Sequence, residues 1–328
     1  MIDGRYRTLR ILLTTYHQAF INPAGGEAEL QQLSEFLNDV GARAEIYGPQ
    51  SKRLGFYDAV IHFSTHGGGE GLLRDIKAAG KPIILVPNFN FFDLDHKSID
   101  VVQRHLDLAD IVVLRTQVEY ELCQRNFVVP GGKITIVPPG IASGFGRPAE
   151  DGLFQAAYGM NEFILWVGQL AEHKRQLETI VALKNVSVPL VFIGGYADRT
   201  YYETCRAMAG DNVRFLPYML PASEILRSAM QSCSLYLELG DDAPGFSVLE
   251  AALAGSPLLL RDHPWSRELL GDIPTYLPSN PFDCLLETVL EKTSGVSAQI
   301  RDADKWKRYI QPNPTIEMLD LISDFLKR

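Results

Sequence analysis

Residues 10–40 decide how this chain folds: Arg10-Ile11-Leu12-Leu13-Thr14 is followed by Asn22-Pro23-Ala24-Gly25-Gly26 and then by a helical pattern from Glu27 to Val40. The short aliphatic run predicts a buried strand, and the Pro/Gly segment predicts a loop. One helical face of the third segment carries Leu30, Leu33, Leu37 and Val40, and Gly41 ends the helix. A buried strand that leads through a loop into an amphipathic helix is the repeating unit of a parallel α/β sheet.

The same alternation continues along the chain in two series. Further strands are predicted at 44–47, 59–63, 83–86, 111–114 and 134–137, and then at 163–167, 190–193, 213–216, 234–237, 257–260 and 275–277. The sequence therefore predicts an α/β protein with two doubly wound Rossmann-like domains, one over residues 1–150 and one over 151–312. The Pro- and Gly-rich segment 138–160 is interpreted as a linker, and an amphipathic helix over 313–328 is expected to pack back on the first domain.

Length and composition restrict the possible functions. With 328 residues, 46% hydrophobic and 22% charged, the chain is a globular protein of about two domains. Its net charge of −9 argues against general binding to nucleic acid. The four cysteines are scattered, without a pair or a Cys/His cluster at metal-ligand spacing, which predicts reduced and mostly buried thiols. No apolar run suits a signal peptide or a membrane span, which predicts a cytoplasmic protein.

In open parallel sheets, ligands bind beyond the carboxyl ends of the strands, so loops that follow strands are candidate sites. Gly25-Gly26 precedes a helix, where free N–H groups suit an anion, although a tight turn explains a Gly pair equally well. Lys174 stands near the start of the helix that follows strand 163–167. A cation there opposes the helix dipole unless an anion lies between them. Lys174 is therefore interpreted as a phosphate ligand or, alternatively, as a solvated surface lysine.

The most informative loop leads into a helix that ends at Gly255, and it reads Asp241-Asp242-Ala243-Pro244-Gly245-Phe246-Ser247-Val248-Leu249-Glu250. Asp242 and Glu250 offer two carboxylates that can accept hydrogen bonds from sugar hydroxyls. Ser247 and Glu250 also have the spacing of a capping box. Glu250 can therefore alternatively be a backbone cap of its own helix.

In this order the motifs resemble those of GT-B glycosyltransferases of the retaining family 4 group, over nearly the whole chain. Residues 23–27 (PAGGE) resemble the family's Gly-Gly loop, and 133–141 (KITIVPPGI) its interdomain KITVIPNGID passage. Residues 166–174 (WVGQLAEHK) are similar to its VGRL…K diphosphate clamp. Asp242 to Glu250 resembles its motif of Glu, seven residues, Glu.

The resemblance implies a GT-B fold, with two Rossmann-like domains facing across a cleft and a nucleoside-diphosphate sugar held mainly by the second. By this analogy Lys174, Asp242 and Glu250 are the catalytic set: Lys174 clamps the diphosphate, Asp242 holds the sugar and Glu250 binds the ribose. Further substrate contacts are implied for Gly25, Gly26, Gln169, Gly194, Gly245, Phe246, Ser247 and Val248. The family neutralises the leaving diphosphate with side-chain cations and helix N-termini, so neither a metal nor a cofactor is expected.

Three positions depart from the family's pattern. Gln169 stands where the clamp usually has an Arg, and an amide supplies no charge. Asp242 is one methylene shorter than the usual Glu, and Asn88 takes the place of a His near the reacting sugar. His66, which follows strand 59–63, is interpreted as an acceptor contact, with a structural His as the alternative.

The leading hypothesis is a retaining, metal-independent transferase that moves a sugar from a nucleoside diphosphate to a glycan or lipid-linked acceptor. It includes no nucleic-acid partner and at most peripheral membrane contact. The alternative is a non-catalytic GT-B subunit that binds a nucleotide sugar or supports a partner transferase, which Gln169 and Asn88 favour. A two-domain periplasmic sugar-binding protein shares the architecture, but it requires a secretory signal, and the sequence predicts none.

Overall fold

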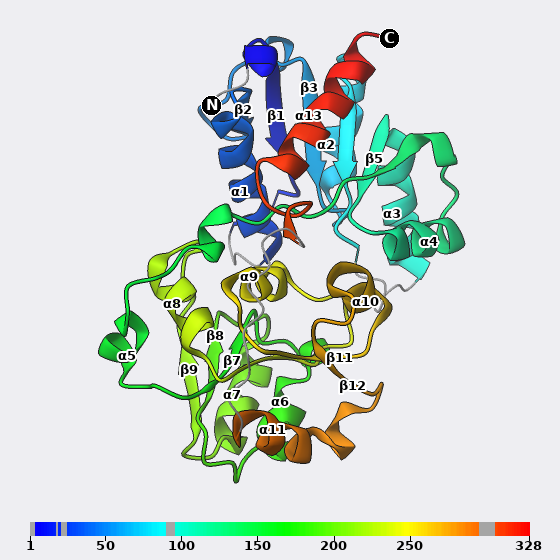
Figure 1. Ribbon diagram of the computed structural model, residues 1–328. Coiled ribbons are helices and arrows are strands. Elements are labelled where there is room, and N and C mark those ends of the chain that lie inside the picture. Colours follow the sequence, from blue (N-terminus) through cyan, green and yellow to red (C-terminus); the bar gives the residue numbers. More distant parts are fainter. Residues whose placement is uncertain (1–3, 18, 21–24, 90–95, 295–305) are drawn as a thin grey trace. The chain divides into compact units, whose positions relative to one another are not determined.

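Two parallel sheets of six strands each organise the chain, as the alternating sequence pattern predicts (Figure 1). The computed structural model describes residues 4–17, 19–20, 25–89, 96–294 and 306–328. The chain divides into a first unit, residues 1–140 with 308–328, and a second unit, residues 141–307. Each unit contains one of the sheets.

The first sheet has the strand order β2-β1-β3-β4-β5-β6, and its neighbouring strands are parallel. Its strands are β1 (Arg10–Thr14), β2 (Arg43–Ile46), β3 (Ala59–Phe63), β4 (Ile83–Val86), β5 (Ile111–Leu114) and β6 (Ile134–Ile136). The helices of the unit are α1 (Gly25–Asp39), α2 (Gly69–Ala78), α3 (His96–Leu108), α4 (Gln117–Asn126) and α13 (Asn313–Leu326). Parallel strands need crossover connections, and α1 to α4 provide them.

The second sheet has the strand order β12-β11-β10-β7-β8-β9 and is also parallel. Its strands are β7 (Ile164–Val167), β8 (Leu190–Ile193), β9 (Val213–Leu216), β10 (Leu235–Glu238), β11 (Leu258–Arg261) and β12 (Thr275–Leu277). The helices are α5 (Leu153–Tyr158), α6 (Gln176–Ala182), α7 (Arg199–Met208), α8 (Glu224–Ser232), α9 (Phe246–Ala254), α10 (Pro264–Leu270) and α11 (Leu285–Ser294). None of the helices that the structure describes is long and apolar enough to cross a bilayer.

The central strands are buried on both faces, which explains their unbroken apolar sequences. Ile11 and Leu13 of β1 face one hydrophobic cluster, and Leu12 between them faces another. The first cluster also contains Leu319 of α13, which has no exposed surface. Helix α13 thus returns from the far end of the chain to cover one face of the first sheet.

Residues 141–160 belong to the second unit, whereas the sequence pattern predicts a linker over 138–160 and a domain boundary at 150. Phe145 and Phe154 are 1% and 0% exposed. The backbone N–H of Phe154, in α5, donates to Ser228 Oγ of α8 at 3.1 Å. Burial of these two aromatic side chains fixes the segment to the second unit, so the boundary lies earlier in the chain than expected.

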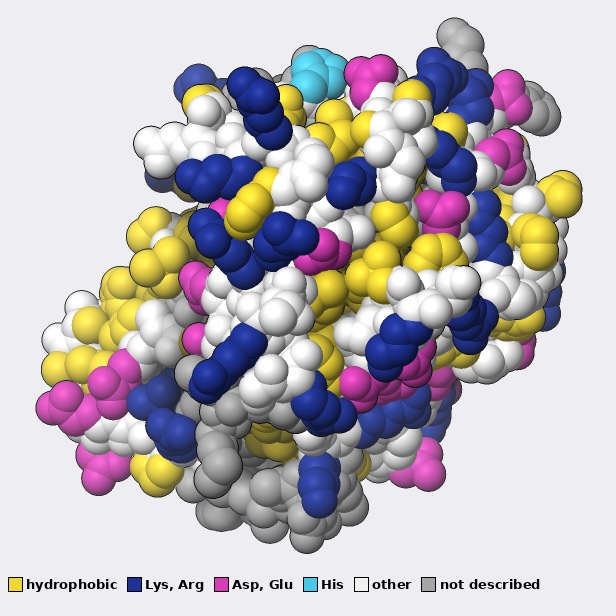
Figure 2. Space-filling view, turned by 90° about the horizontal axis from the view of Figure 1, so that it is seen from above, with side chains coloured by type: hydrophobic (Ala, Val, Ile, Leu, Met, Phe, Trp, Pro, Cys, Tyr) yellow, Lys and Arg dark blue, Asp and Glu magenta, His cyan; other side chains and the backbone are white. Residues whose placement is uncertain are grey.

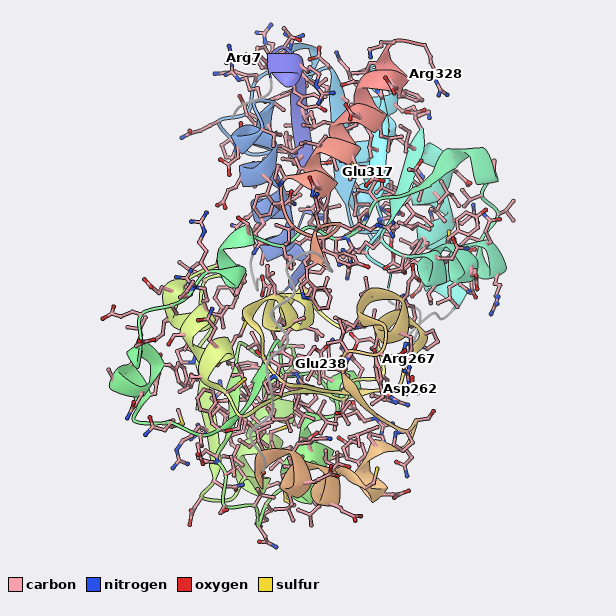
Figure 3. All side chains as sticks on the ribbon, in the orientation of Figure 1. Arg7, Glu238, Asp262, Arg267, Glu317 and Arg328 are labelled. Atoms are coloured by element: carbon pink, nitrogen blue, oxygen red, sulfur yellow. The ribbon has the colours of Figure 1, made fainter. Side chains whose placement is uncertain are left out.

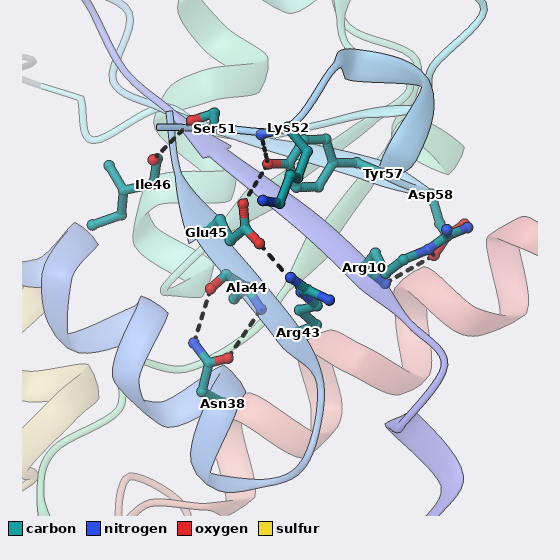
Figure 4. Close-up of polar contacts among 10 residues, drawn as sticks. All are labelled: Arg10, Asn38, Arg43, Ala44, Glu45, Ile46, Ser51, Lys52, Tyr57 and Asp58. Carbon is teal, nitrogen blue, oxygen red and sulfur yellow. Dashed lines mark hydrogen bonds and ion pairs between the residues drawn. The ribbon is translucent and has the colours of Figure 1, made fainter. Parts of the chain in front are cut away.

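Polar contacts hold together the amino ends of the first strands of the first sheet (Figure 4). The Arg10 guanidinium and backbone N–H donate to the Asp58 carboxylate over 2.6–3.0 Å. The Asn38 side chain bonds both the N–H and the carbonyl of Ala44. Figure 2 looks onto this end of the first unit, where Lys and Arg side chains are frequent. The amino edge of the first sheet is therefore held by contacts within the chain, and ligand sites are expected at the carboxyl edges of the sheets.

The position of α13 can be tested by truncating its buried leucine. We expect Leu319→Ala to lower the free energy of unfolding by about 2–5 kcal/mol, because it removes buried methyl groups and leaves a cavity. Leu326 is 37% exposed in the same helix, and Leu326→Ala is the matched control. Urea unfolding followed by circular dichroism measures both variants. Equal effects would show that α13 is not part of the first unit's core.

Candidate functional site

The second sheet reverses its direction of growth between β7 and β10. From β7 the chain continues to β8 and β9 on one side and then returns to β10, β11 and β12 on the other. The loops that leave β7 and β10 therefore diverge, and ligands of open α/β sheets bind at such a switch point. Lys174 follows β7 and Asp242 follows β10, so the topology brings together two of the predicted site residues.

Lys174 lies in an ion cluster with two carboxylates at this point. Its Nζ is 2.8 Å from Asp242 Oδ2 and 3.3 Å from Glu238 Oε1. Glu238 is the last residue of β10 (Figure 3). Gly240 permits the close packing, because a Cβ there would stand 2.7 Å from Asp242 Oδ1 and 3.2 Å from Lys174 Cδ. The chain itself thus supplies an anion beside Lys174.

The charges of this cluster determine its protonation. Burial alone lowers the pKa of Lys174, but Glu238 and Asp242 outweigh it and hold that pKa above its ordinary value. Burial raises the pKa of Glu238 against the opposing effect of Lys174. The side chains of Lys174, Asp242 and Glu238 are 16%, 23% and 6% exposed. Lys174 and Asp242 are thus partly exposed while Glu238 is buried, and the alternative of a solvated surface lysine is wrong.

A second ion cluster centres on Asp241. Its carboxylate accepts from Arg175 Nε at 2.8 Å and from the guanidinium of Arg261, the last residue of β11. Burial acts to raise the pKa of Asp241, but the two arginines outweigh it and lower the pKa. Arg175 has a left-handed backbone, with φ of 61°, just before α6. These contacts tie the start of α6 to the ends of β10 and β11.

The loop after β7 is fixed by a buried glutamine. Gln176 Nε2 donates to the carbonyl of Gln169 at 3.0 Å, and Gln176 Oε1 accepts from the N–H of Ala171 at 3.3 Å. Gln176 has no exposed surface. The side-chain amide of Gln169 makes no hydrogen bond to another residue in the described ranges, so it is available to a ligand.

Helix α9 begins at Phe246 with Gly245 as its N-cap, and no side chain caps it. Ser247 Oγ instead donates to the carbonyl of Val167 at the end of β7, at 2.9 Å. The capping-box alternative for Ser247 and Glu250 is therefore wrong: the hydroxyl is taken by a distant carbonyl that only the folded sheet brings near.

Two of the backbone N–H groups expected at the phosphates have acceptors within the chain. The N–H of Gly245 donates to Glu238 Oε1 at 3.2 Å, and that of Val248 to the carbonyl of Gly245 at 3.1 Å. The Gly245 amide is thus part of the cluster around Glu238.

Glu250 is a buried carboxyl in α9. It is 6% exposed, and within the described part of the chain it has no hydrogen-bond partner. Burial raises its pKa to about 7. Tyr218, in the loop after β9, is near enough for burial and the Glu250 charge to raise the tyrosine pKa. A buried carboxyl without a partner is costly, and such groups concentrate at binding and catalytic sites.

Gly194 has a packing requirement of its own. Its φ is 154°, and a Cβ there would stand 2.1 Å from the carbonyl oxygen of Gly168. The backbones of the loops after β7 and β8 therefore lie in close contact, and only glycine fits at position 194. This packing requirement holds whether or not Gly194 also contacts a ligand.

The first sheet has a switch point between β1 and β3. There Thr14 Oγ1 and His62 Nδ1 form a buried hydrogen bond of 2.9 Å. Burial lowers the pKa of His62 to about 3, so this imidazole is neutral at pH 7. The polar contact at this switch point is therefore uncharged, unlike the ion cluster of the second sheet.

His66 lies on the exposed side of the same edge. Its ring stacks on Tyr16 with centroids 4.8 Å apart, and its Nδ1 is hydrogen-bonded to Ser64 Oγ. Tyr16 donates to Glu27 Oε1 of α1 at 2.8 Å. His66 is thus held by neighbours but is open to solvent, which an acceptor contact requires.

Gly26 and Asn88 meet at this edge as well. A Cβ at Gly26 would stand 3.1 Å from Asn88 Nδ2. Asn88 has a left-handed backbone, with φ of 50°, a strained conformation that is common near functional sites. Gly25 begins α1, while Pro23 and Ala24 of the Gly-Gly loop lie outside the described residues. The carboxyl edge of the first sheet thus holds Gly25, Gly26 and Asn88.

Sequence reasoning does not predict Glu238 and Gly240 in the Lys174 cluster, Arg261 in the Asp241 cluster, or the role of Gln176 in the loop after β7. A signal existed only for Glu238, which is a carboxylate directly after an apolar run. Across the described ranges, no group of three or more His, Cys, Asp or Glu residues could hold a metal ion.

Comparison with solved structures identifies the fold. The chain is similar to Anabaena HepE in complex with UDP and glucose (TM-score 0.74, 14% identity, 96% of this chain and 100% of that one). It is also similar to sucrose-phosphate synthase from Thermosynechococcus elongatus (TM-score 0.77, 14% identity, 97% and 99%). AviGT4, a glycosyltransferase involved in avilamycin A biosynthesis, matches with TM-score 0.64, 14% identity and coverages of 97% and 98%. The chain thus has the GT-B fold of glycosyltransferases. No protein-family model and no curated protein matches the sequence.

The raised pKa of Glu250 gives a pH-dependent prediction. The folded state disfavours the ionised form of Glu250. The free energy of unfolding of the wild type is therefore highest below pH 4.5, the ordinary pKa, and falls as the pH rises towards 7. Glu250→Gln removes this loss, and we expect it to raise the free energy of unfolding by on the order of 2–3 kcal/mol at pH 8 and by less than about 1 kcal/mol at pH 5. Denaturant unfolding at both pH values measures the difference. A variant equally or less stable than wild type at pH 8 would contradict the prediction.

Proposed function

We propose that this chain is a glycosyltransferase that moves a sugar from a nucleoside diphosphate to an acceptor, with retention of configuration and without a metal ion. The observation that carries the proposal is Lys174, a protonated and partly accessible ammonium at the switch point of the second sheet. The shared fold supports it, since HepE was crystallised with UDP-glucose and with UDP and glucose.

The leaving diphosphate is the group that most needs stabilisation. Breaking the glycosyl–phosphate bond develops negative charge on the diphosphate, and prearranged donors there lower the barrier directly. An ammonium has three N–H donors, of which Lys174 directs two at Asp242 and Glu238. The third is available to a phosphate oxygen. The start of α9 adds its helix dipole, which favours an anion.

The remaining polar groups of the second unit suit the neutral parts of the donor. The Asp242 side chain is 23% exposed and is proposed to accept from a sugar hydroxyl; its Oδ1 is buried and has no hydrogen-bond partner among the described residues. Glu250 is proposed to bind the ribose. Gln169, in the loop after β7, and Gly194, in the loop after β8, are proposed as further donor contacts. Retention is proposed to follow front-face attack, in which the leaving phosphate helps to deprotonate the acceptor. This route requires no dedicated carboxylate base.

The carboxyl edge of the first unit is proposed to bind a glycan or lipid-linked acceptor. His66 is exposed there, and Asn88 and Gly26 are held close together. A neutral amide and an imidazole can exchange hydrogen bonds with hydroxyl groups in either direction.

A specific observation supports a second function, that of a non-catalytic subunit that binds a nucleotide sugar. Lys174 is already neutralised by two carboxylates, and Gln169 contributes no charge. Less positive charge is thus offered to the diphosphate than a clamp of Arg and Lys supplies. Binding without turnover would follow.

A thermal-shift panel of UDP, GDP, ADP, CMP and dTDP sugars tests the proposal. We expect one nucleoside diphosphate sugar to raise the melting temperature, because a ligand at about 100 times its Kd adds about 2.7 kcal/mol of stability. Lys174→Ala should abolish the shift, measured against the variant's own melting temperature. Lys184→Ala, which removes an exposed lysine of the same unit, should retain it.

Turnover separates the two functions. Release of nucleoside diphosphate that depends on Lys174 and Glu250 would support the transferase. Binding without turnover of any donor would favour the non-catalytic subunit, and an unchanged shift in Lys174→Ala would remove Lys174 from the site.

A further inference from the structure

One oxygen atom joins the two elements that the proposed function assigns to the diphosphate. Glu238 Oε1 accepts from Lys174 Nζ at 3.3 Å and from the Gly245 N–H at 3.2 Å. Lys174 belongs to the loop after β7, and Gly245 is the N-cap of α9. We propose that Glu238 is a positioning residue, which sets the ammonium of Lys174 and the start of α9 at a fixed separation for the diphosphate. The inference rests on the proposed function.

Burial shows that Glu238 acts through these partners. Its side chain is 6% exposed, against 16% for Lys174, so a ligand meets the lysine and not the glutamate. The second oxygen, Oε2, is buried and has no hydrogen-bond partner in the ranges described. Among the described residues, the hydrogen bonds of the carboxylate are therefore all made by Oε1.

Glu238 and Asp242 together direct the ammonium. Asp242 Oδ2 accepts a second N–H of Lys174 at 2.8 Å. With two of its three N–H donors held, the lysine cannot rotate freely, and its third donor has a fixed direction. A lysine fixed before the donor arrives loses less side-chain entropy on binding, which favours tight binding.

The charge of Glu238 is expected to weaken diphosphate binding, whereas its positioning of Lys174 is expected to strengthen it. Two carboxylates beside one ammonium leave the cluster with a net negative charge when both are ionised, which repels a diphosphate. If Glu238 serves to position Lys174, nucleotide binding depends on the length of its side chain and on one acceptor oxygen, but not on its negative charge. Two substitutions separate these properties: Glu238→Gln keeps the length and one acceptor oxygen, and Glu238→Asp keeps the charge but is one methylene shorter.

The glutamine variant removes no existing hydrogen bond. Its amide oxygen can take the place of Oε1, and its NH2 group takes the place of Oε2, which has no partner among the residues described. The aspartate variant cannot reach both Lys174 and Gly245 from the end of β10.

Isothermal titration calorimetry of the full chain with UDP, GDP, ADP and dTDP tests the inference. For the nucleotide that binds wild type, we expect Glu238→Gln to bind at least as tightly, within about threefold, and Glu238→Asp to bind about tenfold more weakly, a difference of about 1.4 kcal/mol. Glu203→Gln and Glu203→Asp are the matched controls. Glu203 pairs with Arg199 on α7 and is 61% exposed, so both variants should bind like wild type.

The outcomes distinguish the two proposals. If Glu238→Gln binds as weakly as Glu238→Asp, or if Glu238→Asp binds like wild type, Glu238 has no positioning role, while the proposed function stands. If wild type binds none of the four nucleotides, the proposed function fails and the inference fails with it. Circular dichroism and the melting temperature of each variant show that the binding data come from folded protein.

Discussion

The contact of Lys174 with Glu238 and Asp242 organises the second unit's site. It exists because β7 and β10 are parallel neighbours, which places the loop after one beside the end of the other. A buried ion cluster is not by itself a source of stability, because its charges must leave water. Its position at the switch point, where the lysine keeps some exposed surface, is the reason why a role in binding is proposed for it.

The two sheets share an architecture but present different chemistry at their carboxyl edges. In the first, the switch point is marked by a neutral hydrogen bond between Thr14 and His62, with His66 and Asn88 nearby in the following loops. In the second, it is marked by ions. The proposed function would use this division, with a charged nucleoside-diphosphate donor at the second unit and a hydroxyl-bearing acceptor at the first.

Much of the fold could be predicted from the sequence because the strands of parallel sheets are continuous apolar runs. The predicted strands differ from the observed ones only at their end residues. Glu238 shows the limit: the predicted strand stops at residue 237, and the role of the next residue depends on the pairing of β10 with β7. The capping-box alternative for Ser247 is wrong for the same reason: its hydroxyl bonds a carbonyl 80 positions away in the sequence, which local spacing cannot predict. Lys174, Asp242 and Glu250 were selected from local motifs, but their partners and burial are products of the tertiary fold.

The route of the chain through its two units has a consequence for synthesis. The second unit is continuous in sequence, whereas the first needs residues 308–328, including Leu319, to complete its hydrophobic cluster. Ribosomes deliver the chain from its amino end, and domains generally fold as units when their residues emerge. Helix α1 covers part of the same sheet face, but the part contributed by α13 is absent until residues 308–328 have been made, so the unit that is translated first is the last to be completed.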